Sequence, residues 1–130
     1  MQIDKAIIAA IASHAATAHP RECCGLLLGP ASEHITAIQP ARNVAADPAR
    51  HFEIDPQTLF EAIRAERDGG MEIVGYYHSH PNGLAEPSAT DAAQAARDGK
   101  VWAIIARGKI GLWHDTPAGF VPLSYRIADD

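Results

Sequence analysis

The apolar positions in the first part of the chain follow two different periods. From Asp4 to Ala18, Ile and Ala recur at helical spacing behind Asp4 as a suitable N-cap, so we predict a helix that His19-Pro20 ends. Cys23 to Leu28 is an uninterrupted apolar run closed by Gly29-Pro30, which is typical of a buried strand. Glu33 to Pro40 predicts a second strand that pairs with the first one.

The middle of the chain predicts a loop over 41–50, a short strand from His51 to Ile54 and then a helix. Asp55-Pro56 opens this helix, because Asp is favoured at the N-cap and Pro at the first helical position. Asp68-Gly69-Gly70 ends it. The residues expected to form its buried face are Leu59, Phe60, Ala62 and Ile63.

The second half predicts one long apolar strand, a helix and three closing strands. The long strand runs from Met71 to His80, and a helix from Ser88 to about Arg97 follows it, opening with a capping-box pattern. The closing strands are expected at Val101–Ala106, Lys109–Asp115 and Phe120–Ile127. The resulting order is α-β-β-β-α-β-α-β-β-β, within one domain that spans residues 1–130.

Composition limits the possible classes of function. Of the 130 residues, 47% are hydrophobic and 21% are charged, as in ordinary globular proteins, and the net charge is -5. No run of Lys or Arg is present, so we expect no nucleic-acid partner. The N-terminal residues lack a signal-peptide pattern and no apolar run could span a bilayer, so we expect a cytoplasmic protein without a membrane partner. The only cysteines, Cys23 and Cys24, are adjacent and fit a reducing compartment.

The sequence around His78 and His80 carries the strongest chemical signal. Side chains two positions apart on a strand point to the same face, so both imidazoles are expected to lie together. Helix capping alone would explain Ser88 and Asp91, and each histidine alone could be a structural residue. Two histidines on one face, followed by a helix start that bears a carboxylate, predict a metal site. Three protein ligands would leave a fourth position for water, which is typical of hydrolytic zinc sites.

Other families with a His-x-His pair make demands that this sequence does not meet. A zinc deaminase requires His-x-Glu and Pro-Cys-x-x-Cys, and neither pattern occurs. A barrel amidohydrolase needs about 250 residues, and a helical zincin needs His-Glu-x-x-His, which is also absent. The predicted helices argue against an all-β cupin.

The remaining pattern resembles the signature of the JAMM (MPN-plus) metalloprotease family. That signature consists of a Glu and, later in the chain, His-Ser/Thr-His, seven residues, Ser, two residues and Asp. Here these positions are Glu22, His78-Ser79-His80, Pro81–Pro87, Ser88 and Asp91. The segment Arg21–Gly29 is also similar to the family's Glu-bearing first strand. The likeness covers nearly the whole chain, and it is greatest to the compact stand-alone bacterial and archaeal members.

The resemblance implies a fold and a mechanism. The fold would be an α/β three-layer sandwich with a mixed, curved sheet flanked by helices, similar to cytidine deaminases. His78, His80 and Asp91 would hold Zn²⁺, Glu22 would be the general acid and base, and Ser88 would stabilise the oxyanion. The substrate would be a peptide or isopeptide bond at the C-terminal tail of a ubiquitin-like or sulfur-carrier protein. We expect a monomer or a weak homodimer.

Two alternatives stay open. One is a zinc amidase that acts on small peptides or cell-wall fragments, and the other is a non-catalytic MPN interaction module, which the complete ligand set disfavours. Several conspicuous residues are interpreted as structural. Cys23 and Cys24 are expected to face opposite sides of their strand, Ser79 to be buried and hydrogen-bonded, and Trp102 and Trp113 to serve in packing.

Overall fold

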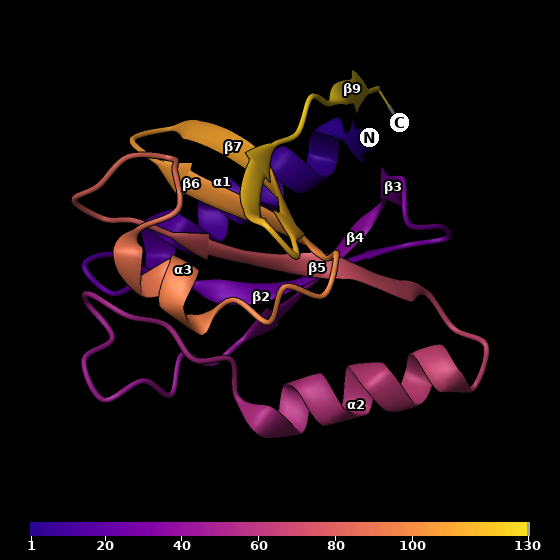
Figure 1. Cartoon of the computed structure of the whole chain (residues 1–130), viewed down its shortest axis with the longest axis horizontal. Coiled ribbons are helices and arrows are strands. Elements are labelled where there is room, and N and C mark those ends of the chain that lie inside the picture. The colour runs from indigo at the N-terminus through magenta and orange to yellow at the C-terminus, as the bar shows by residue number, and fades with distance from the viewer. Residues whose placement is uncertain (130) are drawn as a thin grey trace.

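The computed structural model describes residues 1–129 and contains two sheets and three helices (Figure 1). The helices are α1 (Lys5–Ala18), α2 (Pro56–Arg67) and α3 (Ala89–Gln94). The strands are β1 (Gln2–Asp4), β2 (Cys24–Gly29), β3 (His34–Ile35), β4 (Ala37–Ala41), β5 (Glu72–Ser79), β6 (Val101–Ala106), β7 (Lys109–Thr116), β8 (Gly119–Pro122) and β9 (Arg126–Ala128).

The main sheet has six strands in the order β4-β2-β5-β6-β7-β8. Only β5 and β6 are parallel, and the other neighbours are antiparallel. A connection through α3 links β5 to β6, as a parallel pair requires. Gly75 lets these two strands approach closely, because a Cβ there would lie 1.7 Å from the carbonyl oxygen of Val101. The end of β5 is therefore held between β2 and β6 in the middle of the sheet.

Apolar side chains cover both faces of this sheet. On one face Ile7 and Ile11 of α1 pack in a core cluster with Tyr77 and Ala103. On the other face Phe52 and Trp102 form a smaller cluster, on the side where α2 and α3 lie (Figure 1). The helices and the sheet thus form three layers, which confirms the predicted mixed α/β sandwich.

Several predicted elements have different bounds. Residues 2–4 form β1, which pairs in parallel with β3 and β9 in a second sheet and was not predicted. The predicted strand 33–40 is split between the two sheets at Thr36, and the last strand is split into β8 and β9. Residues His51–Ile54 are not a strand, since among the described residues they make only the isolated bridge from Ile54 to Asn43.

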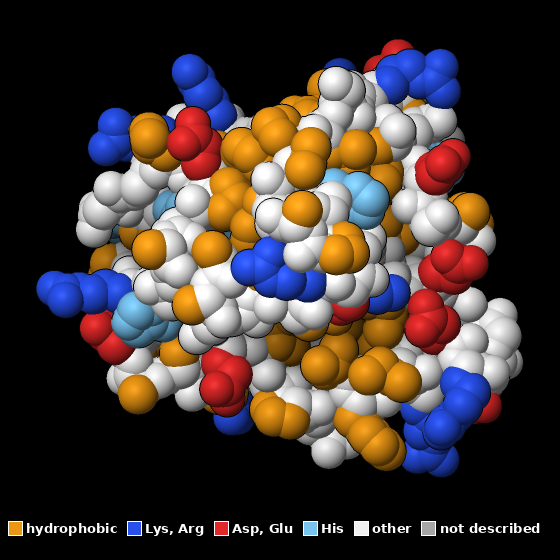
Figure 2. Space-filling model, in the orientation of Figure 1, with side chains coloured by type: hydrophobic (Ala, Val, Ile, Leu, Met, Phe, Trp, Pro, Cys, Tyr) orange, Lys and Arg blue, Asp and Glu red, His pale blue; other side chains and the backbone are white. Residues whose placement is uncertain are grey.

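Helix α2 begins as predicted but does not bury the expected face. Asp55 Oδ1 accepts a hydrogen bond from Gln57 N at 3.2 Å, and Pro56 is the first helical residue. No residue of α2 is buried, and Phe60 and Ile63 are 57% and 47% exposed. The prediction of a buried Leu59, Phe60, Ala62 and Ile63 face was wrong, because α2 lies at the margin of the sheet. Hydrophobic side chains accordingly appear on the surface in the lower part of Figure 2.

The capping of the other helices follows the sequence more closely. His19 ends α1, and α3 opens with the predicted capping box at Ser88, although it ends at Gln94 rather than Arg97. Asp4 precedes α1 but makes no capping hydrogen bond, because its Oδ1 binds Nε2 of His34 at 2.8 Å. No helix within residues 1–129 has the length and apolar character needed to cross a membrane.

Candidate metal centre and active site

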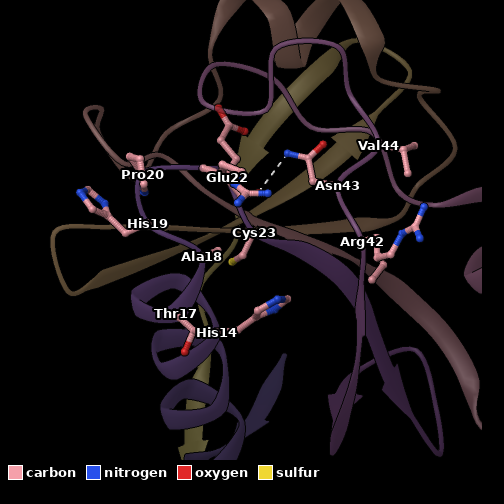
Figure 3. Close-up of a pocket in the computed structure, with 12 residues that line it drawn as sticks. His14, Thr17, Ala18, His19, Pro20, Glu22, Cys23, Arg42, Asn43 and Val44 are labelled. Atoms are coloured by element: carbon pink, nitrogen blue, oxygen red, sulfur yellow. Dashed lines mark hydrogen bonds between the residues drawn. The ribbon is translucent and has the colours of Figure 1, made fainter.

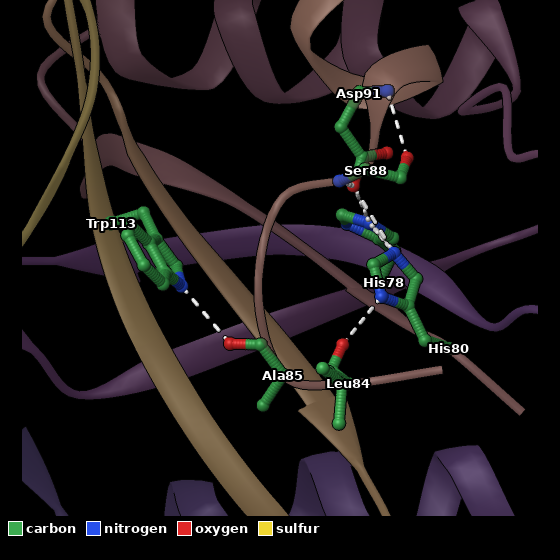
Figure 4. A network of polar contacts seen from close by, with 7 residues as sticks. All are labelled: His78, His80, Leu84, Ala85, Ser88, Asp91 and Trp113. Carbon is green, nitrogen blue, oxygen red and sulfur yellow. Dashed lines mark hydrogen bonds and ion pairs between the residues drawn. The ribbon is translucent and has the colours of Figure 1, made fainter. Parts of the chain in front are cut away.

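The two histidines of the predicted site lie together at the end of β5. His78 is in the strand and His80 follows it, and their Nε2 atoms are 3.0 Å apart. His80 Nδ1 lies 2.7 Å from the carbonyl oxygen of Leu84 (Figure 4). Because only a protonated Nδ1 can donate to that carbonyl, Nε2 of His80 is the nitrogen left free as a ligand.

His78 is oriented by packing. Its ring is fully buried, stacks on Phe52 at a centroid distance of 4.2 Å and meets the edge of Trp102 at 5.6 Å. Its Nδ1 is buried and has no hydrogen-bond partner within residues 1–129. Phe52 therefore acts as a support for the site, although the sequence interpretation did not single it out.

Asp91 reaches the histidines from the first turn of α3. Its Oδ2 lies 3.1 Å from Nε2 of His78 and 3.1 Å from Nε2 of His80. The same oxygen accepts a hydrogen bond from Ser88 N at 2.9 Å, while Ser88 Oγ accepts one from Asp91 N at 3.0 Å. The capping box therefore aims the carboxylate at the histidines, as Figure 4 shows.

These three side chains fit a metal ion. Ligand atoms at about 2.0–2.1 Å from a tetrahedral zinc ion are about 3.4 Å from one another, close to the spacing observed here. Two imidazole nitrogens and one carboxylate oxygen are also a donor set that zinc accepts. His78, His80 and Asp91 are thus brought together, as the sequence predicted.

The electrostatics of His78 and Asp91 suit metal binding. Burial lowers the pKa of His78, which favours its neutral form. Burial opposes ionisation of Asp91, but its contacts with the two imidazoles outweigh burial and hold the pKa of Asp91 well below its usual range. Asp91 is therefore a carboxylate at any ordinary pH, as metal binding requires.

Glu22 approaches the histidines from the residue pair that precedes β2. It is only 6% exposed, and one carboxylate oxygen lies within 4.8 Å of both histidine ligand nitrogens. Burial raises the pKa of Glu22 to about 7, with repulsion by Asp91 adding to the shift and the charge of His80 opposing it. A carboxyl group with this pKa can both accept and return a proton near neutral pH.

Two carboxylates thus compete for the third ligand position. Glu22, His78 and His80 form one possible metal cluster, whose ligand atoms lie within 4.8 Å of one another. Asp91 Oδ2, by comparison, lies only 3.1 Å from Nε2 of each histidine. The shorter and symmetric approach favours Asp91 as the ligand. Glu22 then stays beside the two histidines as a buried carboxyl group that is not needed as a ligand.

The backbone at Glu22 is held by a loop that the sequence interpretation left without a role. Glu22 N donates to Pro48 O at 2.7 Å, and Asn43 Nδ2 donates to Glu22 O at 3.0 Å (Figure 3). Asn43 Nδ2 also donates to His51 O at 2.9 Å, and its Oδ1 accepts from Glu53 N at 3.1 Å. A single amide side chain in an Ala-rich loop was the only sequence signal for this organising residue.

Ser88 lies at the entrance of the site. It is exposed, and together with Glu22, Arg50, His80 and Asn82 it lines a pocket of about 320 Å³. Its Oγ accepts from the amide of Asp91, so its hydroxyl proton is free to be donated to a bound group. The capping role of Ser88 is thus compatible with contact to a substrate.

The residues interpreted as structural lie as expected. Cys23 and Cys24 are buried, are not bridged, and belong to the core clusters on opposite faces of the sheet. Ser79 is buried, and its Oγ accepts from Cys23 N at 2.8 Å. Trp102 is buried in the smaller cluster, and Trp113 is packed against it.

Comparison with known proteins places this arrangement in a family. A family model for prokaryotic homologues of the JAB domain matches residues 4–117, which include all five residues of the site. The chain belongs to the prokaryotic JAB family. The resemblance noted in the sequence is thereby confirmed.

Curated relatives of this JAB-family chain have different names. Desampylase from Haloferax volcanii is 41% identical over 86 residues, covering 65% of the chain and 62% of the relative. Tail tip assembly protein K from Escherichia phage N15 is 35% identical over 92% of the chain and 46% of the relative. CysO-cysteine peptidase from Mycobacterium tuberculosis is 33% identical over 68% of the chain and 61% of the relative. The chain therefore spans less than two thirds of the length of these relatives.

Solved structures share the fold of the JAB-family chain. A solution structure of a Desulfitobacterium hafniense protein has a TM-score of 0.86 at 26% identity, covering 99% of this chain and 93% of that one. A JAB1/MPN domain protein from Archaeoglobus fulgidus has a TM-score of 0.68 at 20% identity, covering 99% of this chain and 100% of that one. The architecture seen here is thus that of a JAB1/MPN domain.

Proposed function

We propose that this JAB-family protein is a zinc-dependent peptidase that cleaves an amide bond at the C-terminal tail of a ubiquitin-like or sulfur-carrier protein. The observation that carries the proposal is the His78, His80 and Asp91 triangle, with the buried carboxyl group of Glu22 close to both histidines. The names of two relatives, desampylase and CysO-cysteine peptidase, support the substrate class.

In this proposal His78, His80 and Asp91 hold the metal ion. Zinc, when bound, polarises the substrate carbonyl and lowers the pKa of water to about 7. Asp91 would bring negative charge to the ion. The hydrogen bond from Ser88 N holds the position of Asp91 Oδ2, the oxygen that faces the histidines. His80 keeps Nε2 turned to the ion through its bond to Leu84 O.

Glu22 and Ser88 carry the proton and charge movements. The Glu22 carboxylate removes a proton from the attacking water and then delivers it to the nitrogen of the leaving amine, so that the carboxylate is restored. The Ser88 hydroxyl donates a hydrogen bond to the substrate oxygen while negative charge develops on it. Burial of Glu22 keeps this proton transfer within the site.

The direct test uses zinc-loaded protein and a panel of sulfur-carrier and ubiquitin-like proteins with C-terminal extensions, with products identified by mass spectrometry. We expect cleavage after the natural C-terminus and about one zinc per chain. The Glu22→Gln protein should retain zinc and lose at least ~10²-fold in kcat. A folded protein that rejects zinc, or a Glu22→Gln protein with full activity, would disprove the mechanism.

One observation favours a second candidate function. The tail tip assembly protein of phage N15 is similar over 92% of the chain, a wider match than that of the two peptidases. In this second candidate, the same zinc amidase would act on a small peptide or a cell-wall fragment. Cleavage of such fragments without cleavage of any protein tail would select this candidate.

A further inference from the structure

A second pocket lies on the α2 side of the sheet, next to the rings that support His78. Its volume is about 470 Å³, and its apolar lining includes Phe52, Tyr76 and Trp102 with Ile54 and Leu59. Phe52 and Trp102 both contact His78, so the pocket and the metal centre share a wall. None of the proposed ligands, nor Glu22 or Ser88, lines this pocket.

Two buried polar atoms of the pocket lining lack partners. Trp102 Nε1 and Asp115 Oδ1 have no hydrogen-bond partner within residues 1–129, although their residues are only 5% and 1% exposed. The other oxygen of Asp115 accepts from Arg97 N at 2.9 Å. A buried donor or acceptor that stays unpaired is destabilising, so a bound group that pairs with these atoms is favoured.

The charge of the pocket selects among possible ligands. Its lining contains the carboxylates of Glu53, Asp98 and Asp115, and no Lys or Arg among the described residues. Two basic residues close in sequence to Asp98 direct their cationic groups to backbone carbonyls, since Lys100 Nζ donates to Ile73 O at 2.8 Å and Arg97 Nη1 donates to Pro117 O at 3.3 Å. The lining of the pocket is therefore acidic.

Aromatic walls combined with carboxylates suit a basic side chain. The aliphatic stem of Lys or Arg can lie against aromatic rings, while the cation interacts with the ring faces and pairs with carboxylates. The carbonyl of the same residue can accept from Trp102 Nε1. An acidic or purely apolar group would leave Asp115 Oδ1 without a donor.

We propose that this pocket binds a Lys or Arg side chain of the protein substrate and so selects substrates at a position away from the scissile bond. The assignment of the partner as the substrate rests on the proposed function. The preference for a cation rests on the pocket residues alone, and it can be tested without turnover.

The first test follows indole N–H signals by NMR in ¹⁵N-labelled protein. Trp113 Nε1 donates to Ala85 O at 3.1 Å and serves as an internal reference, whereas Trp102 Nε1 is free to respond. Titration with N-acetyl-lysine amide or N-acetyl-arginine amide should shift the Trp102 signal to saturation. N-acetyl-norleucine amide, which lacks the cation, should bind at least five-fold more weakly. Equal binding of the neutral probe, or no Trp102 response to either cation, would overturn the proposal.

Matched variants separate the charge from the shape of the pocket. Asp115→Asn keeps an acceptor for Arg97 N and removes the charge, and Asp98→Asn keeps an acceptor for Lys100 N and removes the charge at an exposed position. Each should weaken the cationic probes about five- to tenfold. Glu33→Gln, an exposed change outside the pocket, should leave binding unchanged. Unaltered binding in both pocket variants would contradict the proposal.

The two proposals fail in different ways. If the protein binds the cationic probes but cleaves no tail, the proposed function is wrong and the pocket assignment holds. If the wild-type and Asp98→Asn proteins cleave tails with the same KM and neither binds the probes, the proposed function holds and the pocket assignment is wrong. The pocket assignment also predicts that Asp98→Asn raises KM for protein substrates and leaves kcat unchanged.

Discussion

The side chains of Ser88 and Asp91 each accept a hydrogen bond from the other residue's backbone amide, at 3.0 and 2.9 Å. The Asp91 oxygen that takes part, Oδ2, is also the atom that lies 3.1 Å from both histidines. The start of α3 and the candidate metal centre therefore depend on one atom. Changes to the helix cap and changes to the metal site can be separated only by measuring both.

Ser88→Ala should affect stability and turnover but not zinc content. Loss of the cap costs about 1 kcal/mol of unfolding free energy, and loss of the hydroxyl donor should lower kcat by about 10²-fold. Urea unfolding, zinc analysis and steady-state kinetics measure the three quantities. Ser88→Thr is the matched control and should restore most of both losses. Full kcat in the Ala protein would remove Ser88 from the chemistry.

Asp91→Asn should weaken zinc binding by at least ~100-fold, because the ligand loses its negative charge. The amide can still accept from Ser88 N, but the metal-free protein should also lose stability, because the lowered pKa of Asp91 means that its carboxylate stabilises the folded state. Competition with a chromophoric chelator measures the affinity. Asp55→Asn makes the same change at the N-cap of α2, away from the site, and should leave zinc affinity unchanged. Similar zinc affinity in both variants would exclude Asp91 as a ligand.

Phe52→Leu should loosen the metal centre without touching the ion. The Phe52 ring stacks on His78 at 4.2 Å, and His78 has no Nδ1 partner within the described residues to hold it. We expect a three- to tenfold weaker zinc affinity and about 1 kcal/mol lower stability. Phe60→Leu changes an exposed ring of α2 and is the control. An unchanged affinity would show that packing does not position His78.

Glu22 should make the stability of the metal-free protein depend on pH. Burial raises the pKa of Glu22 from 4.5 to about 7 in the folded chain, so the folded state keeps a proton that the unfolded state has lost. This contribution to stability is fully present below pH ~4.5 and is lost as pH rises through about 7. Glu22→Gln lacks this loss and should be about 1–2 kcal/mol more stable than wild type at pH 8, after allowance for solvent screening.

The comparison with Glu22→Gln requires urea unfolding in the presence of a chelator at pH 4, 6 and 8. The difference between the two proteins should be smallest at pH 4 and grow toward pH 8. A difference that is constant across this range would mean that the Glu22 carboxyl titrates with its ordinary pKa.

Local patterns in the sequence predicted the elements that carry the site. Strand alternation placed His78 and His80 on one face, and the capping pattern predicted the bonds between Ser88 and Asp91. The approach of Glu22 could not be read from local patterns, because it depends on antiparallel pairing of β2 with β5; only the family resemblance indicated it.

The failures also have physical causes. The pattern of α2 indicated which of its residues are apolar, but it could not indicate whether another element packs against them. Phe60 is 57% exposed because nothing covers it among the described residues. Strand β1 has three residues and owes its existence to parallel pairing with β3 and β9, which no local signal encodes. Asn43 organises the loop beside Glu22 through backbone contacts that become visible only in three dimensions.

The proximity of His78, His80 and Asp91 in sequence, with only 13 positions from the first to the last, has a consequence for thermodynamics. An unfolded chain keeps these three side chains within reach of one another, so it can bind zinc as well. Ligand binding stabilises a protein only by the difference in affinity between its folded and unfolded states. Zinc should therefore raise the melting temperature less than its affinity for the folded protein would suggest. A melting experiment alone would underestimate how tightly the native site holds its metal.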